Sequence, residues 1–67
     1  MEGWVCVFSS GDHFQTTIKQ HLLESHEIQV IQLSKKDSNY LFGYFELLVR
    51  NEDVMRANHL LAASGDE

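Results

Sequence analysis

The apolar residues of this 67-residue chain change their spacing from one segment to the next, and this change constrains the fold more than any other feature. Runs of β-branched and aromatic residues predict strands, whereas apolar steps of three and four residues predict helices. The pattern predicts an α+β fold in the order β-α-β-β-α, within one domain (1–67, ordered over about 3–63). The predicted segments are strands at 4–8, 28–33 and 44–49, and helices at 12–25 and from 51 to about 63.

Polar residues mark where the predicted helices begin and end. Asp12, with Gln15 three residues later, is typical of a helix N-cap, and Ser10 is an equally good candidate. Asn51 is the expected cap of the second helix. Residues 26–27 follow the first helix, so we expect that helix to end without a glycine cap.

Connection rules limit how these segments assemble. The first strand, helix and second strand form a right-handed crossover, and the third strand can return antiparallel to the second. The third strand then lies between the other two, giving a three-stranded antiparallel or mixed sheet of order 1-3-2. Both helices cover one face of this sheet. The result is a ferredoxin-like plan that lacks its fourth strand.

The opposite face of this sheet has no helix to cover it. Glu46 is best placed on that face, which turns Phe45, Leu47 and Val49 towards the helices. We expect the uncovered face to carry Trp4, Cys6, Phe8, Tyr44, Glu46 and Leu48. A contiguous apolar surface of this kind usually marks an interface. The sequence therefore predicts a homodimer, formed through this face or through the edge of the first strand.

Charge and composition exclude several classes of protein. Ten acidic against five basic residues give a net charge of −5, which is the wrong sign for nucleic-acid binding. No stretch approaches the roughly 20 apolar residues of a membrane helix, and we expect no signal peptide. One cysteine cannot form an internal disulfide, so the cytoplasm is the expected compartment.

The connection at 34–43 is the first candidate binding site. Its polar residues are Lys35, Lys36, Asp37, Ser38 and Asn39. Their ammonium, hydroxyl and amide groups can hold a small anion or a carboxylate of a partner protein. The same residues also suit a solvated turn, in which residues 40–42 anchor the chain and Gly43 permits a kink. Both interpretations stay open at this point.

No residue pattern predicts catalysis, a metal site or a cofactor. His13, His21 and His26 are eight and five residues apart, and His59 lies on the other helix, so they lack metal-ligand spacing. Cys6 is the only thiol, and a strand position does not bring it to a helix N-terminus that would activate it. We expect no catalytic residue, and we expect that the protein is not an enzyme.

Particular residues also resemble a known family. They are residues 4–10 (WVCVFSS) and the run KKDSNYLFG at 35–43, which leads directly into YFELLV at 44–49. Glu52-Asp53 and Arg56-Ala57 then open the last helix. Over residues 3–63 the chain is similar to small bacterial proteins described as putative prokaryotic signal-transducing proteins.

The resemblance implies a compact relative of the PII-type (GlnB-like) regulators, which have a ferredoxin-like core and a long signalling loop. Here the connecting segment is far shorter than that loop and the last strand is missing, so no nucleotide-binding or modified residue is carried over. We expect a non-catalytic regulatory module that docks a partner protein or a small ligand. The alternative is a sensor that binds a small anionic metabolite beside Lys35 and Lys36.

Overall fold

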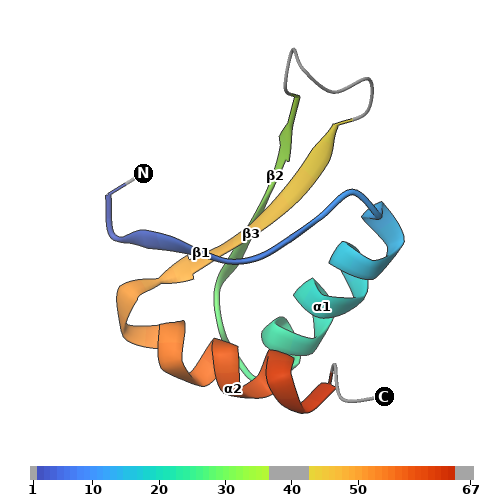
Figure 1. The fold of residues 1–67 in the computed structure, drawn as a ribbon. Coiled ribbons are helices and arrows are strands. Elements are labelled where there is room, and N and C mark those ends of the chain that lie inside the picture. Colours follow the sequence, from blue (N-terminus) through green and yellow to red (C-terminus); the bar gives the residue numbers. More distant parts are fainter. Residues whose placement is uncertain (1, 37–42, 65–67) are drawn as a thin grey trace.

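The computed structural model describes residues 2–36 and 43–64 and confirms the predicted order of elements (Figure 1). The strands are β1 (Trp4–Ser10), β2 (Val30–Lys35) and β3 (Tyr44–Arg50), and the helices are α1 (His13–Ser25) and α2 (Val54–Ser64). A short 3-10 turn, η1 (Asn51–Asp53), leads into α2. No helix among the described residues is both long and apolar enough to cross a bilayer.

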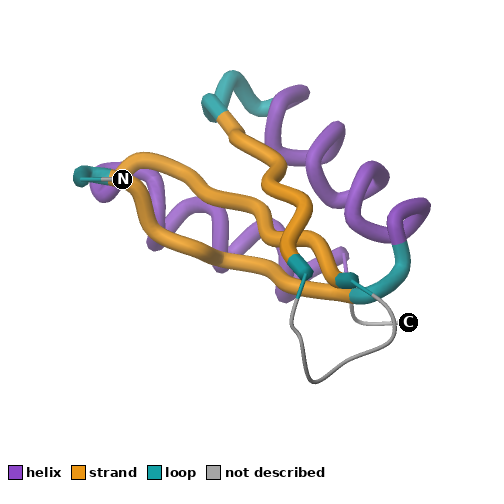
Figure 2. The backbone as a smooth tube through the Cα atoms, turned by 90° about the horizontal axis from the view of Figure 1, so that it is seen from above, coloured by secondary structure: helices purple, strands orange, loops and turns teal. Residues whose placement is uncertain are grey.

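The sheet has the predicted order β1-β3-β2, and both strand pairs are antiparallel. Figure 2 shows the same arrangement from above, with β3 as the central strand. Because side chains of paired residues project to the same side of a sheet, the register assigns each residue to a face. Val5 and Val30 both pair with Val49 and share its face.

Both helices pack on the face of the sheet that carries Val49. Val49, Leu23 of α1 and Ala57 of α2 form one core cluster, and all three are completely buried. Leu47 is equally buried, and Phe45 stacks on His13 of α1 with ring centroids 4.8 Å apart. The prediction that Leu47, Val49 and Phe45 lie beneath the helices is therefore confirmed.

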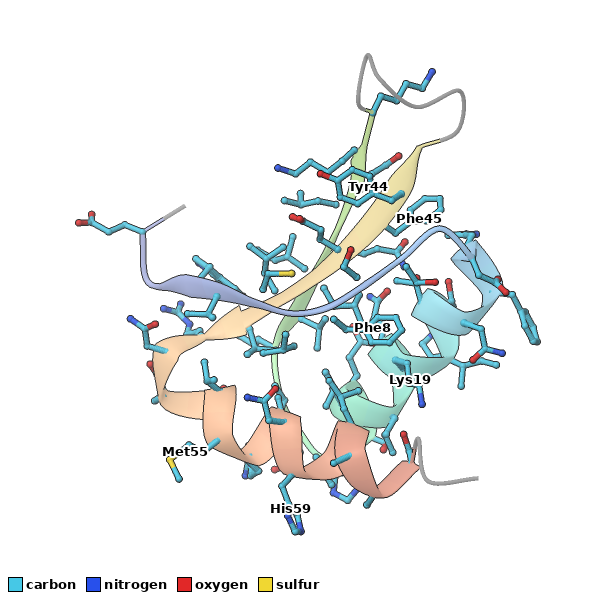
Figure 3. The ribbon with its side chains drawn as sticks, viewed as in Figure 1. Phe8, Lys19, Tyr44, Phe45, Met55 and His59 are labelled. Atoms are coloured by element: carbon cyan, nitrogen blue, oxygen red, sulfur yellow. The ribbon has the colours of Figure 1, made fainter. Side chains whose placement is uncertain are left out.

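A β-bulge in β1 overturns one predicted orientation. Cys6 pairs with Leu48, but Phe8 pairs with Leu47, so Val7 is an extra residue in β1. Phe8 was expected on the uncovered face, and this was wrong, since its partner Leu47 faces the helices. Figure 3 shows Phe8 between β1 and α1.

Asp12, one of the two residues predicted as the N-cap of α1, lies directly before the helix. The Asp12 carboxylate accepts a hydrogen bond from the backbone N–H of Gln15 (3.2 Å), and Ser10 Oγ accepts one from the N–H of Asp12 (3.0 Å). Asp12 is therefore the N-cap, and Ser10 supports its backbone. The Lys19 ammonium joins the two helices by donating to Ser64 Oγ of α2 (2.9 Å).

Two predicted boundaries were wrong. Asn51 does not cap α2: it lies in η1, and its N–H donates to the carbonyl of Gly3 (3.0 Å). The second strand begins at Val30 and extends to Lys35, and does not span 28–33. Ile28 instead closes the turn that follows α1, because its N–H donates to the Leu23 carbonyl (3.2 Å) and its side chain is buried with Leu23.

Glu27 takes the position that glycine usually holds at a helix end. The Glu27 N–H donates to the Glu24 carbonyl (2.9 Å), and together with the bond from Ile28 this is the Schellman arrangement. The φ angle of Glu27 is 63°, in the left-handed region, where a Cβ atom is unfavourable. As predicted, α1 ends without a glycine, and the cost is local backbone strain.

Replacing Glu27 by glycine is expected to stabilise the protein. Glu27→Gly removes the Cβ from a left-handed position, and the free energy of unfolding should rise by about 1 kcal/mol. For a domain of this size, that corresponds to a rise in Tm of roughly 4–8 °C. Glu24→Gly, the same change inside α1, should instead cost about 1 kcal/mol. Thermal unfolding, followed by circular dichroism, measures the stability of both variants. A Glu27→Gly variant that is less stable than the wild type would show that the backbone of Glu27 is not strained.

The bulge predicts which of two neighbouring residues of β1 stabilises the fold. Phe8→Asn places an amide between β1 and α1 and should lower the free energy of unfolding by at least about 2 kcal/mol. Ser9→Asn introduces the same side chain at an exposed position, and should cost less than about 1 kcal/mol. Urea unfolding measures the free energy of unfolding of the two variants. If both variants lose the same amount of stability, the observed register of β1 against β3 is contradicted.

Candidate functional site

The sheet face opposite the helices carries a mainly apolar set of side chains, which we call the open face. It is assigned from the strand register, by which residues opposite Leu48, Glu46, Tyr44 and Arg50 project away from the helices. The open face consists of Trp4, Cys6, Ser9, Ile31, Leu33, Lys35, Tyr44, Glu46, Leu48 and Arg50.

Five of the six residues predicted for an interface lie together on the open face. They are Trp4, Cys6, Tyr44, Glu46 and Leu48, whereas Phe8 lies on the helix side. Figure 3 shows Tyr44 and Phe45 pointing to opposite sides of β3. Leu48 is only 9% exposed, although it projects away from both helices. Its neighbours on the flanking strands, Cys6 and Ile31, are opposite it in the register and shield it.

The second strand contributes two residues that sequence reasoning missed. Ile31 and Leu33 project onto the open face, while Gln32 and Ser34 point towards the helices. Val30, the first residue of β2, packs on the core cluster, but from Ile31 onwards this is the reverse of the usual arrangement, in which a strand turns its apolar residues towards the covered side. Two of the three apolar residues of β2 therefore extend the open face across all three strands.

The strands carry three charged side chains, and all of them project onto the open face. Lys35 and Glu46 form a salt bridge of 3.8 Å between Nζ and Oε1, with side chains 47% and 23% exposed. A pair this exposed contributes little to stability, on the order of 0–1 kcal/mol. It nevertheless neutralises Glu46, the only carboxylate in the three strands.

The predicted binding loop is described only in part. Lys35 is the last residue of β2, Lys36 is exposed, and Asp37, Ser38 and Asn39 lie outside the described residues. Gly43 returns the chain to β3, and a Cβ atom there would lie 2.6 Å from the carbonyl oxygen of Lys35. The base of this connection therefore requires glycine for steric reasons.

An open, shallow cavity of about 610 Å³ lies at one end of the sheet, where β1 and β2 begin and where β3 and α1 end. Its lining combines apolar side chains with charges of both signs. The lining residues are Trp4, Glu24, Glu27, Ile28, Gln29, Val30, Ile31 and Arg50. None of the charged residues among them was singled out by the sequence for binding, because they belong to separate segments of the chain.

Arg50 is the cationic residue of this cavity, and two neighbours fix its position. Its guanidinium carbon lies 5.2 Å from the ring centroid of Trp4, a cation–π contact. Its Nε donates to Oε1 of Gln29 (3.3 Å). Within residues 2–36 and 43–64, no carboxylate lies within 4 Å of this guanidinium. The terminal nitrogens of Arg50 are thus held in place beside the cavity.

Glu24 and Glu27 supply the anionic side of the cavity. Gln20 donates from Nε2 to Glu24 Oε2 (3.1 Å), which steadies that carboxylate on α1. The last turn of α1 contains no basic residue. The partial negative charge of the helix C-terminus therefore adds to that of the two carboxylates.

His13, His59 and Cys6 lie on three different elements. His13 stacks on Phe45, and Figure 3 shows His59 pointing away from the sheet. In the described part of the chain, no three His, Cys, Asp or Glu side chains are grouped closely enough to hold a metal ion. Cys6 is exposed on the open face, and its thiol donates to the Phe8 carbonyl (3.4 Å).

The close approach at the base of the connection predicts the effect of a small substitution. Gly43→Ala would force the backbones of Gly43 and Lys35 apart, with an expected loss of about 1–3 kcal/mol of unfolding free energy. Gly11→Ala is the matched control, since its Cβ would make an ordinary contact of 3.8 Å. That variant should change stability by less than about 1 kcal/mol. Chemical denaturation compares the two, and an unaffected Gly43→Ala would rule out the steric requirement.

The comparisons with known proteins give one family. The family model described as "Putative prokaryotic signal transducing protein" matches residues 4–65. No curated protein and no solved structure matches the chain. The match covers nearly the whole sequence and includes all three strands, both helices, the open face and the cavity. The chain therefore belongs to the family that this model describes.

Proposed function

We propose that the protein is a non-catalytic, cytoplasmic regulatory module that acts by docking, and that its open face joins a second copy of the chain. The observation that carries the proposal is the inverted polarity of β2 after Val30, which itself packs on the core. Ile31 and Leu33 project onto the open face, while Gln32 and Ser34 face the helices. A strand with this pattern gains from burial of its outer side.

The composition of the open face suits an interface between two copies. A standard interface takes about 800 Å² from each partner, roughly a sixth of the 4864 Å² accessible surface. The apolar residues Trp4, Cys6, Ile31 and Leu33 come from the two outer strands and can form the centre of such a contact, above the buried Leu48 of β3. Burial at about 25 cal/mol per Å² would add several kcal/mol to a domain with a small core.

The distribution of charge also favours contact between copies. The chain has a net charge of −5, which would make two copies repel each other at most surfaces. On the open face the only strand carboxylate, Glu46, is paired with Lys35, and Arg50 adds one positive charge. Two open faces can therefore meet without bringing carboxylates together.

Two measurements test the proposed dimer: the molecular mass in solution, and the rate at which Cys6 reacts with a thiol reagent. Light scattering after gel filtration should show a dimer that dissociates on dilution. Cys6 is the only cysteine and is exposed on the open face, so a thiol reagent should react with it more slowly in the dimer. Cys6→Asp should be a monomer at concentrations where the wild type is a dimer, because it buries a charge in the contact.

Met55→Asp is the matched control, because Met55 is 87% exposed on α2, away from the open face. It should remain a dimer. A wild-type monomer at every concentration would overturn the proposal. A dimer in which Cys6 reacts as fast as in the monomer would also overturn it, because the contact would then lie elsewhere, for example at the outer edge of β1. The thiol measurement needs no variant, so it stands even if Cys6→Asp fails to fold.

The metabolite sensor beside Lys35 and Lys36 stays a hypothesis. Three of its five residues lie outside the described part of the chain. The Lys35 ammonium already has a carboxylate neighbour, Glu46, at 3.8 Å. We therefore favour docking through the open face.

A further inference from the structure

The cavity at the end of the sheet is widely open to solvent and has the volume of a small-molecule site. Its volume of about 610 Å³ falls within the range of about 300–1,000 Å³ that is usual for such sites. Four elements or their ends meet there, so the lining residues are held by β1, β2, β3 and the end of α1. The question is which chemistry its lining would recognise.

One side of the cavity is built to accept a carboxylate. The Arg50 guanidinium is held over the Trp4 ring and has its Nε engaged by Gln29. No carboxylate of the described residues pairs with its two terminal nitrogens, and a guanidinium fixed in this way binds a carboxylate in a defined orientation. Since both neighbours are already in place, little side-chain freedom remains to be lost on binding.

The other side is built to accept an ammonium group. Glu24 and Glu27 both line the cavity, and α1 ends there without a basic residue in its last turn. Glu27 is held in a left-handed conformation by backbone hydrogen bonds, although glycine would be less strained there. The chain thus keeps a carboxylate at the cavity at a cost in stability, a pattern typical of functional positions.

The remaining lining is apolar and joins the two charged sides. Trp4, Val30 and Ile31 contribute apolar surface between the end of α1 and Arg50. A ligand with only a negative charge would be repelled by the two carboxylates, and a ligand with only a positive charge would be repelled by Arg50. A ligand with one charge of each sign satisfies both sides.

We propose that this cavity binds a small apolar zwitterion, of the class of apolar amino acids and short apolar peptides with free termini. The ligand carboxylate contacts Arg50, the ligand ammonium contacts Glu24 and Glu27, and the apolar part lies on Trp4 and Ile31. Trp4, Ile31 and Arg50 also belong to the open face, so the ligand and a second copy of the chain would compete for these three side chains.

Trp4 provides a direct readout, because it is the only tryptophan of the chain and it lines the cavity. The full chain is titrated with the dipeptide Leu-Leu and with L-leucine, and Trp4 fluorescence should change in a saturable way with at least one of them. Calorimetric titration gives the dissociation constants independently. N-acetylated and C-amidated Leu-Leu each lose one charge, and each should bind at least about tenfold more weakly than Leu-Leu.

Variants assign each end of the ligand to its partner. Arg50→Gln should weaken binding of Leu-Leu about tenfold or more, but leave binding of the C-amidated peptide unchanged. Glu27→Gln should weaken Leu-Leu binding and leave the N-acetylated peptide unaffected. Arg56→Gln is the matched control, since Arg56 pairs with Asp53 near the start of α2 and does not line the cavity. It should bind as the wild type does.

Three results would overturn the proposal: no saturable response to either probe, equal binding of free and blocked peptides, or equal losses in Arg50→Gln and Arg56→Gln. Far-ultraviolet circular dichroism establishes that each variant is folded before it is titrated. Calorimetry on protein diluted below the concentration of any dimer separates this proposal from the dimer, because either can fail without the other.

Discussion

The central position of β3 is the constraint on which the rest of the structure depends. Among the described strands, β1 and β2 each pair with β3 and not with each other. Leu47 and Val49 of β3 are completely buried, and Val49 belongs to the cluster that includes both helices. The open face, the helix layer and the cavity all take their geometry from this one strand. A small chain with no internal disulfide concentrates its stability there.

Much of the fold could be predicted because its signals are local. The apolar spacing gave the order of elements, and Asp12 and Gln15 gave the start of α1. Glu46 predicted the orientation of β3, since one carboxylate in an apolar strand distinguishes the two faces. These features depend on residues a few positions apart, for which a single sequence is informative.

The errors arise where pairing with distant residues decides the outcome. Val7 and Phe8 are both apolar, so nothing in β1 itself reveals which of them is the extra residue. Only the register against β3, about 40 residues later, places Phe8 beneath the helices. Ile28 is a second example. Its side chain suits a strand, but its backbone N–H donates to the Leu23 carbonyl and closes the turn that follows α1. After Val30 the polarity of β2 is inverted, so a rule that turns apolar residues towards the helices would have excluded Ile31 and Leu33 from the site. The charged residues of the cavity are Glu24, Glu27 and Arg50, and no local sequence pattern connects them.

The strand order also has a consequence for the growing chain on the ribosome. Because β3 is the third strand to be synthesised but the central one in the sheet, β1 and β2 must both wait for it. Until Arg50 has emerged, the nascent polypeptide holds two strands that have no partner, together with an α1 that has no sheet to cover. The sheet therefore cannot form until β3 has left the ribosome, and the first two strands stay without a sheet partner during most of the synthesis of this domain.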